Sequence, residues 1–273
     1  MSSSSSTNSG AIVVVAKCPL PGASKTRLIP LLGEKGAATL AKAMLSDILT
    51  SLVQHMKEQQ VILYYAPGTD EIRMYMLAIL DALGIAKEID LVPMLHGDLQ
   101  GRDLGDQLSN ALREAQKRTS GNIMFLGMDS PELPIDELQE AFRHPKHATL
   151  CPSYDGGYGM VCVPHDAPAD TIFSNVLWSH PSTALSQLKA LSDANVDIRL
   201  GRIMRDIDEP EDVRTLMDEM LVKNEEQLPP LITQDLKSLQ ESSANKGDAM
   251  NSDYPRTKQA LQELKEFIVK EKA

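Results

Sequence analysis

The sequence predicts an α/β protein with a single doubly wound, mainly parallel sheet flanked by helices, and a C-terminal helical extension. The first apolar run, at 11–16, is short, rich in Val and Ile, and bounded by Gly10 and Pro19, as a buried strand is. The apolar spacing then becomes helical, and strand-like and helix-like segments alternate to about residue 222. This alternation is typical of βαβ units and a parallel sheet.

The individual elements follow from the spacing of the apolar residues. Short apolar runs predict strands at 11–16, 61–66, 89–92, 122–127, 148–151, 159–163 and 196–200. Helical spacing predicts helices over 33–56, 70–83, 103–116, a short segment opening near 134, and 210–221. In the first helix Leu40, Met44, Ile48 and Leu52 recur every four residues, so we expect it to be long and amphipathic.

Four segments are expected along the chain. Residues 1–10 are a Ser-rich tail expected to be disordered, and 11–222 form the α/β domain. Residues 223–253 have the polar composition of a linker. Residues 254–273 predict an amphipathic helix that starts near Pro255. Its apolar stripe is expected to pack on the domain or on a second copy, because mixed Glu and Lys on the polar face disfavour a membrane surface.

Charge and composition exclude several classes of function. The 273 residues include 27 basic and 38 acidic ones, and the formal net charge of −11 disfavours binding to nucleic acid. Three cysteines without a CxxC spacing indicate neither a disulfide framework nor a zinc site. No apolar run approaches the roughly 20 residues that span a bilayer, and no secretory signal is recognisable. We therefore expect a cytoplasmic protein that binds neither nucleic acid nor membrane.

The first candidate for ligand binding is the loop at 16–28, at the carboxyl end of the first strand, where open α/β sheets bind ligands. It combines a glycine turn with cations, as binding of a di- or triphosphate requires. The residues predicted to bind phosphate are Lys17, Gly22, Lys25 and Arg27. A Walker P-loop would need glycines where Pro19 and Ser24 stand, and no Rossmann Gly-x-Gly-x-x-Gly is present. A solvated basic turn is the alternative.

The second candidate is the segment 127–134, in which an apolar strand ends in Asp129. A carboxylate at the same sheet edge as the basic loop can hold Mg²⁺ or Mn²⁺ beside phosphate oxygens, and Gly127 lies where backbone could approach the phosphate. The alternative is that Asp129 or Ser130 caps the next helix.

Two further acidic segments follow. Asp155 precedes Gly156 and Gly157 between short strands, so it is a candidate metal ligand and catalytic group with phosphate-binding glycines beside it, although Asp-Gly is also a common hairpin turn. In the segment 205–213, Asp208 is favoured as the N-cap of the helix from residue 210, and Asp206 is the weaker candidate for a site. Trp178 could line a substrate pocket or anchor the core.

Six segments together carry a family resemblance. They are AKCPLPGASKTRL, QGRDLGDQL, FLGMDSPELP, YDGGYG, FSNVLWS and DIDEPEDV. This ordered set, spread over about 11–221, resembles the rSAM/selenodomain-associated transferase type 1 family of the GT-A-like nucleotide-diphosphosugar transferases. The resemblance implies a GT-A fold for 11–222, a nucleotide or nucleotide sugar in the cleft, and Mg²⁺ or Mn²⁺ held by acidic residues.

Several residues match the family pattern and others depart from it. The matching positions are Lys17, Lys25 and Arg27 in the basic loop, Asp129 at the strand end, and Asp155 before the paired glycines. The departures are Gly159 in place of an aromatic residue, Gln107 in place of Arg, and His180 in place of Thr. The change at His180, close to Trp178, affects the expected acceptor specificity. The acceptor pocket is expected to include Asp103, Trp178 and Ser179.

The resemblance implies a glycosyltransferase-like enzyme that uses a nucleotide-diphosphate sugar donor and a small-molecule acceptor. Lys25 and Asp155 are its expected catalytic residues, and Asp129 and Asp155 its expected metal ligands. A nucleotidyltransferase that releases pyrophosphate is the alternative, because phospholactate guanylyltransferases have a similar Lys-x-Arg-Leu loop. A non-catalytic sugar-nucleotide-binding protein is a third reading, and a homo-oligomer is left open.

Overall fold

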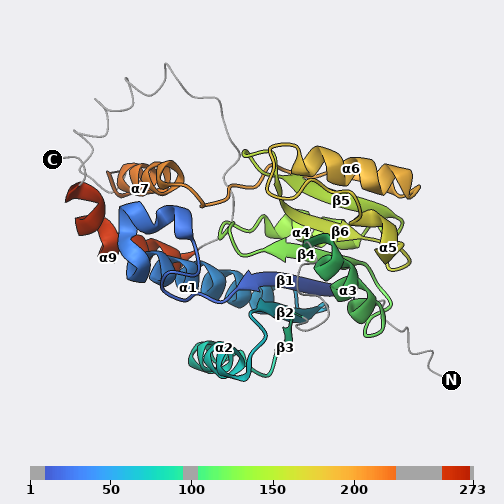
Figure 1. The fold of residues 1–273 in the computed structure, drawn as a ribbon, viewed down its shortest axis with the longest axis horizontal. Coiled ribbons are helices and arrows are strands. Elements are labelled where there is room, and N and C mark those ends of the chain that lie inside the picture. Colours follow the sequence, from blue (N-terminus) through green and yellow to red (C-terminus); the bar gives the residue numbers. More distant parts are fainter. Residues whose placement is uncertain (1–9, 95–103, 226–253, 271–273) are drawn as a thin grey trace, which may run out of the picture.

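The protein is a mixed α/β fold around one seven-stranded sheet (Figure 1). A computed structural model describes residues 10–94, 104–225 and 254–270. The sheet order is β3-β2-β1-β4-β6-β5-β7, and β6 alone runs antiparallel to its neighbours within this sheet. The strands are β1 Ala11–Lys17, β2 Gln60–Ala66, β3 Ile89–Pro93, β4 Ile123–Gly127, β5 His147–Pro152, β6 Tyr158–Val163 and β7 Asp197–Leu200. The predicted fold class is confirmed.

Helices cover both faces of this sheet. On one face α1, α2 and α4 pack over alternate residues of β1 such as Ile12 and Val14, and on the other α3, α5 and α6 pack over Ala11 and Val13. The helices are α1 Ile29–His55, α2 Asp70–Leu83, α3 Leu104–Gln116, α4 Ile135–Phe142, α5 Ala169–Ile172, α6 Thr183–Asp193, α7 Pro210–Glu225 and α9 Pro255–Lys270, with a short 3₁₀ turn η1 at Thr26–Leu28. Apolar residues on both faces make the central strands continuous hydrophobic runs.

The strand directions bring three loops to one edge of the sheet. β1 and β4 are parallel and in register from Ala11 beside Ile123 to Val15 beside Gly127, so their following loops start side by side. β5 points the same way, and the turn that joins it to the antiparallel β6 lies at the same edge. The loop after β1, the loop after β4 and the β5–β6 turn therefore converge, as expected for the ligand-binding edge of an α/β sheet.

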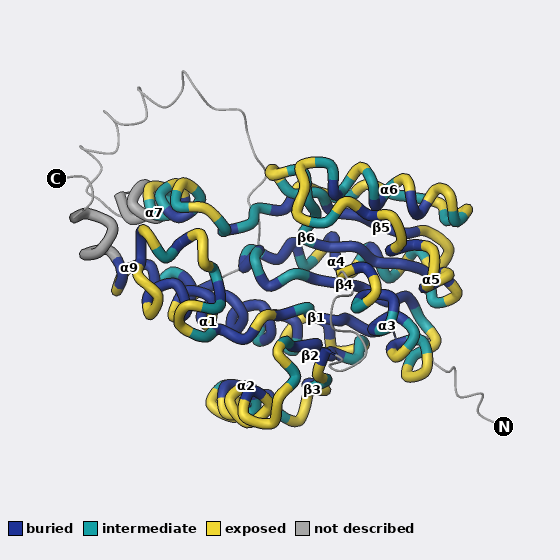
Figure 2. The backbone as a smooth tube through the Cα atoms, viewed as in Figure 1, coloured by how far each residue is buried: buried dark blue, intermediate teal, exposed yellow. Residues whose placement is uncertain are grey.

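Helix α1 differs from the predicted amphipathic helix. It begins at Ile29, and Gly33, with φ 69°, interrupts its first turns. It is buried on almost every side, because the sheet covers one side and α7 and α9 cover the other (Figure 2). By length and apolar composition Thr26–His55 could span a membrane, but 78% of its apolar window is buried inside the fold, as in the core helix of a globular domain.

The C-terminal helix α9 supplies part of that cover. Its apolar stripe, with Leu261 fully buried and Leu264 7% exposed, packs on Leu32 and Leu40 of α1. The buried carboxylate of Asp47 on α1 accepts the backbone N–H groups of Arg256 and Thr257 at 3.2 and 2.7 Å. A carboxylate on one helix thus satisfies the free N–H groups at the start of another. The stripe packs on its own domain, one of the two predicted alternatives.

Two helices were not predicted. They are α5, a single turn, and α6, which begins at Thr183. The sequence does contain a helical pattern for α6, because Ala184, Leu188 and Leu191 recur at helical spacing. These residues pack on the sheet.

We predict that Asp47→Ala destabilises the protein by about 2 kcal/mol, because it leaves the start of α9 without its buried acceptor. Asp81→Ala, which removes an exposed carboxylate on α2, is the control and should change stability by less than about 0.5 kcal/mol. Urea unfolding measures both. Equal stabilities for the two variants would show that the contact between Asp47 and α9 contributes nothing to the fold.

Candidate functional site

The segment 204–208 runs between the end of β5 and the loop after β4, at the edge of the sheet where the loops converge. The Met204 N–H donates to the Pro152 carbonyl at the end of β5, 2.8 Å, and the Ile207 N–H donates to the Asp129 carbonyl after β4, 2.9 Å. Gly159 leaves room for this approach, because a Cβ there would lie 3.0 Å from the Met204 sulfur. These two hydrogen bonds place Asp206 between the loop that contains Asp129 and the turn that contains Asp155.

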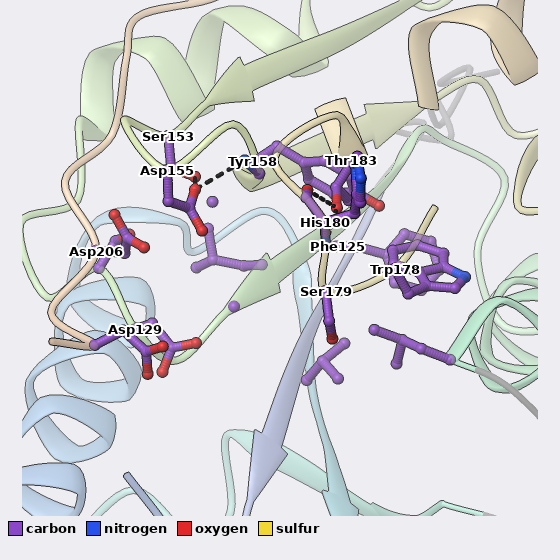
Figure 3. A pocket seen from close by; sticks show the side chains of 18 of the residues that line it. Phe125, Asp129, Ser153, Asp155, Tyr158, Trp178, Ser179, His180, Thr183 and Asp206 are labelled. Carbon is purple, nitrogen blue, oxygen red and sulfur yellow. Dashed lines mark hydrogen bonds between the residues drawn. The ribbon is translucent and has the colours of Figure 1, made fainter. Parts of the chain in front are cut away.

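These segments surround a cavity of about 490 Å³. Figure 3 shows its two ends: the carboxylates of Asp129, Asp155 and Asp206 lie together at one, and the rings of Phe125 and Trp178 lie at the other. The lining residues are Val15, Arg27, Leu104, Leu108, Phe125, Leu126, Gly127, Asp129, Ser130, Ser153, Asp155, Gly157, Tyr158, Gly159, Trp178, Ser179, His180, Pro181, Thr183, Asp206 and Asp208. A cavity with an apolar half and a few converging polar groups is typical of a small-molecule site.

Asp155 is held in place by the turn in which it lies. Its Oδ1 accepts hydrogen bonds from the Ser153 hydroxyl and, at 2.8 Å, from the Gly157 N–H. Gly156 has φ 87°, and a Cβ on it would lie 1.9 Å from the Pro181 carbonyl oxygen, so a glycine is required where the turn meets the start of α6. Asp155 therefore lies in a hairpin turn and also lines the cavity, so the turn and the site, given as alternatives from the sequence, do not exclude each other.

The acidic end carries unbalanced negative charge. Burial, followed by the nearby carboxylates of Asp155, Asp212 and Asp129, raises the pKa of Asp206 to about 6. Desolvation and like charge both disfavour an ionised carboxyl group. Asp206 lines the cavity together with Asp129 and Asp155. Its own segment gave only a weak signal, because Asp129 and Asp155 come from distant parts of the chain.

Two cations of the first loop meet this acidic end. The Lys25 ammonium lies 2.6 Å from Asp129 Oδ1, and the Arg27 guanidinium lies 2.7 Å from Asp208 Oδ2. The Lys25 side chain is 4% exposed, whereas that of Arg27 is 59% exposed and lines the cavity. Arg27 is thus positioned to meet a ligand, and Lys25 is already engaged by the protein.

The other predicted residues divide into two groups. Gly127, Gly157, Trp178 and Ser179 line the cavity. Lys17 is exposed at the end of β1, Gly22 lies beside the Glu34 carboxylate and Gly156 packs on Pro181, so these three are outside the cavity lining. Asp103 lies outside the described residues.

The predicted role of Asp208 as a helix N-cap is wrong, and so is the alternative that Asp129 or Ser130 caps the helix after β4. The carboxylate of Asp212 accepts the N–H groups of Asp208 and Glu209, while the side chain of Asp208 binds the first loop. Helix α4 has Pro134 at its N-cap without a side-chain hydrogen bond, so neither Asp129 nor Ser130 caps it. Asp129 and Asp208 do not cap a helix, and both line the cavity.

The carboxylates at the acidic end of the cavity do not form a closed metal site in the described part of the chain. Within 10–94, 104–225 and 254–270, no three His, Cys, Asp or Glu side chains are grouped closely enough to hold one ion. Mg²⁺, however, keeps several waters and needs only one or two protein carboxylates. Asp129 and Asp155 both line the cavity and offer only oxygen donors, the kind that a hard divalent cation prefers.

Part of the chain matches a known family. The family model described as an uncharacterized protein conserved in bacteria (DUF2064) matches residues 49–180. The matched range contains Asp129, Asp155 and Trp178, and it excludes the first loop and Asp206. The resemblance to the rSAM/selenodomain-associated transferases remains a prediction. Among curated proteins, none matches this chain significantly.

The fold of this chain is also found in solved structures of other proteins. The chain is similar to a candidate nucleotide-diphospho-sugar transferase from Desulfovibrio desulfuricans G20, with TM-score 0.70, 20% identity and coverage of 96% of this chain and 97% of that one. A cytidylyltransferase from Leptospira borgpetersenii has TM-score 0.49 and 12% identity, covering 96% and 97%. A CMP:2-keto-3-deoxy-manno-octonic acid synthetase complexed with CTP has TM-score 0.47 and 14% identity, covering 78% and 99%.

We predict that Asp206→Asn stabilises the protein at pH 8 by about 1 kcal/mol, a value reduced for partial solvent exposure. The folded-state pKa of about 6 lies above the ordinary value of 3.8, so the wild type loses stability as pH rises between these values. The variant lacks this loss and should match the wild type near pH 3.5. Thermal unfolding across pH measures the difference, with the exposed Asp166→Asn as control. A variant less stable than the wild type at pH 8 would contradict the assignment.

Proposed function

We propose that this protein is a metal-dependent, glycosyltransferase-like enzyme that uses a nucleotide-diphosphate sugar donor and a small-molecule acceptor. The observation that carries the proposal is the convergence of Asp129, Asp155 and Asp206 with Arg27 on one cavity at the carboxyl edge of the sheet. Oxygen donors for a cation and an accessible guanidinium together suit a diphosphate. The similarity in fold to a candidate nucleotide-diphospho-sugar transferase is consistent with this reading.

The two ends of the cavity would divide the binding of the donor. Arg27, at the acidic end, would bind the diphosphate through its fixed pair of N–H donors. Tyr158 and Trp178, whose ring centroids are 6.4 Å apart, would contact the flat face of a base or sugar at the apolar end. Tyr158 is fixed for this purpose by its hydroxyl, which donates to Gln187 Oε1 at 3.0 Å.

Asp206 is the best placed group to accept the acceptor's proton. Its carboxyl lies within the acidic end, where burial is the largest cause of its raised pKa, and a base with a raised pKa takes a proton more readily than an ordinary aspartate does. The acceptor oxygen would form its bond to the anomeric carbon as the bond from that carbon to the diphosphate breaks, and its proton would pass to Asp206. Ser179 and His180 also line the cavity.

Asp129 and Asp155 are the residues that would hold Mg²⁺ or Mn²⁺. When bound, such an ion supplies positive charge that stabilises a diphosphate leaving group. The protein's own part is to fix these carboxylates, Asp155 through Ser153 and Gly157 and Asp129 through the backbone bond to Ile207.

Product analysis tests the reaction class. With Mn²⁺, a panel of nucleotide sugars and candidate acceptors, the wild type should release free nucleoside diphosphate, and Asp206→Asn should lower kcat by about 100-fold. Asp166→Asn, outside the cavity, is the matched control. Pyrophosphate released from a nucleoside triphosphate would instead assign nucleotidyl transfer, and nucleotide-sugar binding without any turnover would assign a binding protein.

Removal of the Arg27 guanidinium should weaken phosphate binding selectively. We predict that Arg27→Ala weakens binding of a nucleoside diphosphate by roughly tenfold, because one charge-assisted contact is lost. The bare nucleoside should bind as before. Isothermal titration measures both ligands, and Arg202→Ala, which removes an arginine paired with Asp136 outside the cavity, is the control. Equal losses for the diphosphate and the nucleoside would mean that the substitution disturbed the site as a whole.

A further inference from the structure

The Lys25 ammonium occupies a cage made only of oxygen atoms. Asp129 Oδ1 lies 2.6 Å from Nζ, the Ile207 carbonyl 2.5 Å and Asp208 Oδ1 3.4 Å. Two carboxylates and a carbonyl are also the donor set that a hard divalent cation prefers. Lys25 therefore stands where the chain offers its own ligands for a cation.

The fold commits Lys25 to this position. Its side chain is 4% exposed, and its backbone has φ 49° and ψ 46°, a left-handed conformation that residues other than glycine seldom adopt. The next turn, η1, begins directly after it and carries Arg27 outward to the cavity. The two cations of this loop therefore differ in position. Arg27 lines the cavity, whereas Lys25 is buried against the carboxylates of Asp129 and Asp208 and is not part of the lining.

We propose that Lys25 is the resident counter-ion of the acidic site and that a divalent cation competes with its ammonium for Asp129. The inference rests on the proposed function, because that function assigns Asp129 to a cation. Lys25 neutralises Asp129 and connects the loop after β1 to the segment 204–208. A divalent cation takes over the neutralisation and frees the ammonium, which the flexible lysine stem can then extend to a phosphate.

The competition has a direct consequence for cation affinity. Without the Lys25 ammonium, Asp129 and Asp208 lose a buried positive charge, so the site should attract a divalent cation more strongly. If Lys25 instead served only as a phosphate ligand, its loss would leave binding of the ion alone unchanged. The two roles are therefore separated by measuring metal binding without nucleotide.

The test is titration of Mn²⁺ alone, followed by electron paramagnetic resonance of the free ion. Lys25→Met should bind Mn²⁺ at least tenfold more tightly than the wild type, and Lys25→Arg, which keeps the charge, should stay within threefold of the wild type. Arg27→Met is the matched control, because it removes an exposed cation that pairs with Asp208 but not with Asp129. It too should stay within threefold.

Opposite results overturn the proposal. Weaker or unchanged Mn²⁺ binding by a folded Lys25→Met, or an equal gain in Arg27→Met, would show that Lys25 does not compete with the ion. Failure of Mn²⁺ to bind the wild type and Lys25→Met alike would also overturn it. That failure would leave the proposed transfer reaction open to its own test, since product release is measured separately.

A second measurement uses the wild-type protein and does not depend on folding of a variant. Reductive methylation of lysines, read residue by residue by mass spectrometry, should find Lys25 protected without a divalent ion and modified at least threefold faster in saturating Mn²⁺. Lys189, an exposed lysine far along the chain in α6, should react at the same rate in both conditions. Equal protection of Lys25 with and without the ion would contradict displacement.

Discussion

The alignment of the strand ends is the constraint on which the site depends. β1 and β4 end in register, and the single reversal at β6 returns the chain to the same edge of the sheet. Asp129 and Asp155, 26 positions apart, are therefore neighbours around one cavity. The backbone bonds of Met204 and Ile207 then add Asp206 between them. The topology thus concentrates carboxylates at this edge, and their repulsion adds to burial in raising the pKa of Asp206.

The C-terminal helix supports the same loops from behind. Burial raises the pKa of Tyr254 at the start of α9, and Glu132 in the loop after β4 raises it further. Arg205, next to Asp206, lies 2.7 Å from Glu219 of α7. Since α7 and α9 pack on α1 around Leu261, the acidic loops are backed by a hydrophobic cluster rather than by solvent.

The sequence predicts what depends on local order and misses what depends on distant contacts. Strand ends located Asp129 and Asp155, because a polar residue after an apolar run marks the edge of a sheet. Asp208 was predicted to be a helix cap, since nothing near it in sequence shows that Lys25, 183 positions earlier, lies within reach. The same limit applies to α1, whose buried outer side depends on α9. Burial on both sides cannot be read from the apolar spacing of one helix.

The central claim is that the acidic end of this cavity binds a nucleotide through a divalent cation. Its most direct test is equilibrium titration of the wild-type protein with nucleoside diphosphates and nucleotide sugars, in Mn²⁺ and again in EDTA. The account predicts saturable binding of one nucleotide per chain in Mn²⁺ and at least tenfold weaker binding in EDTA. Binding of equal strength in both conditions, or no nucleotide binding in Mn²⁺, would contradict it.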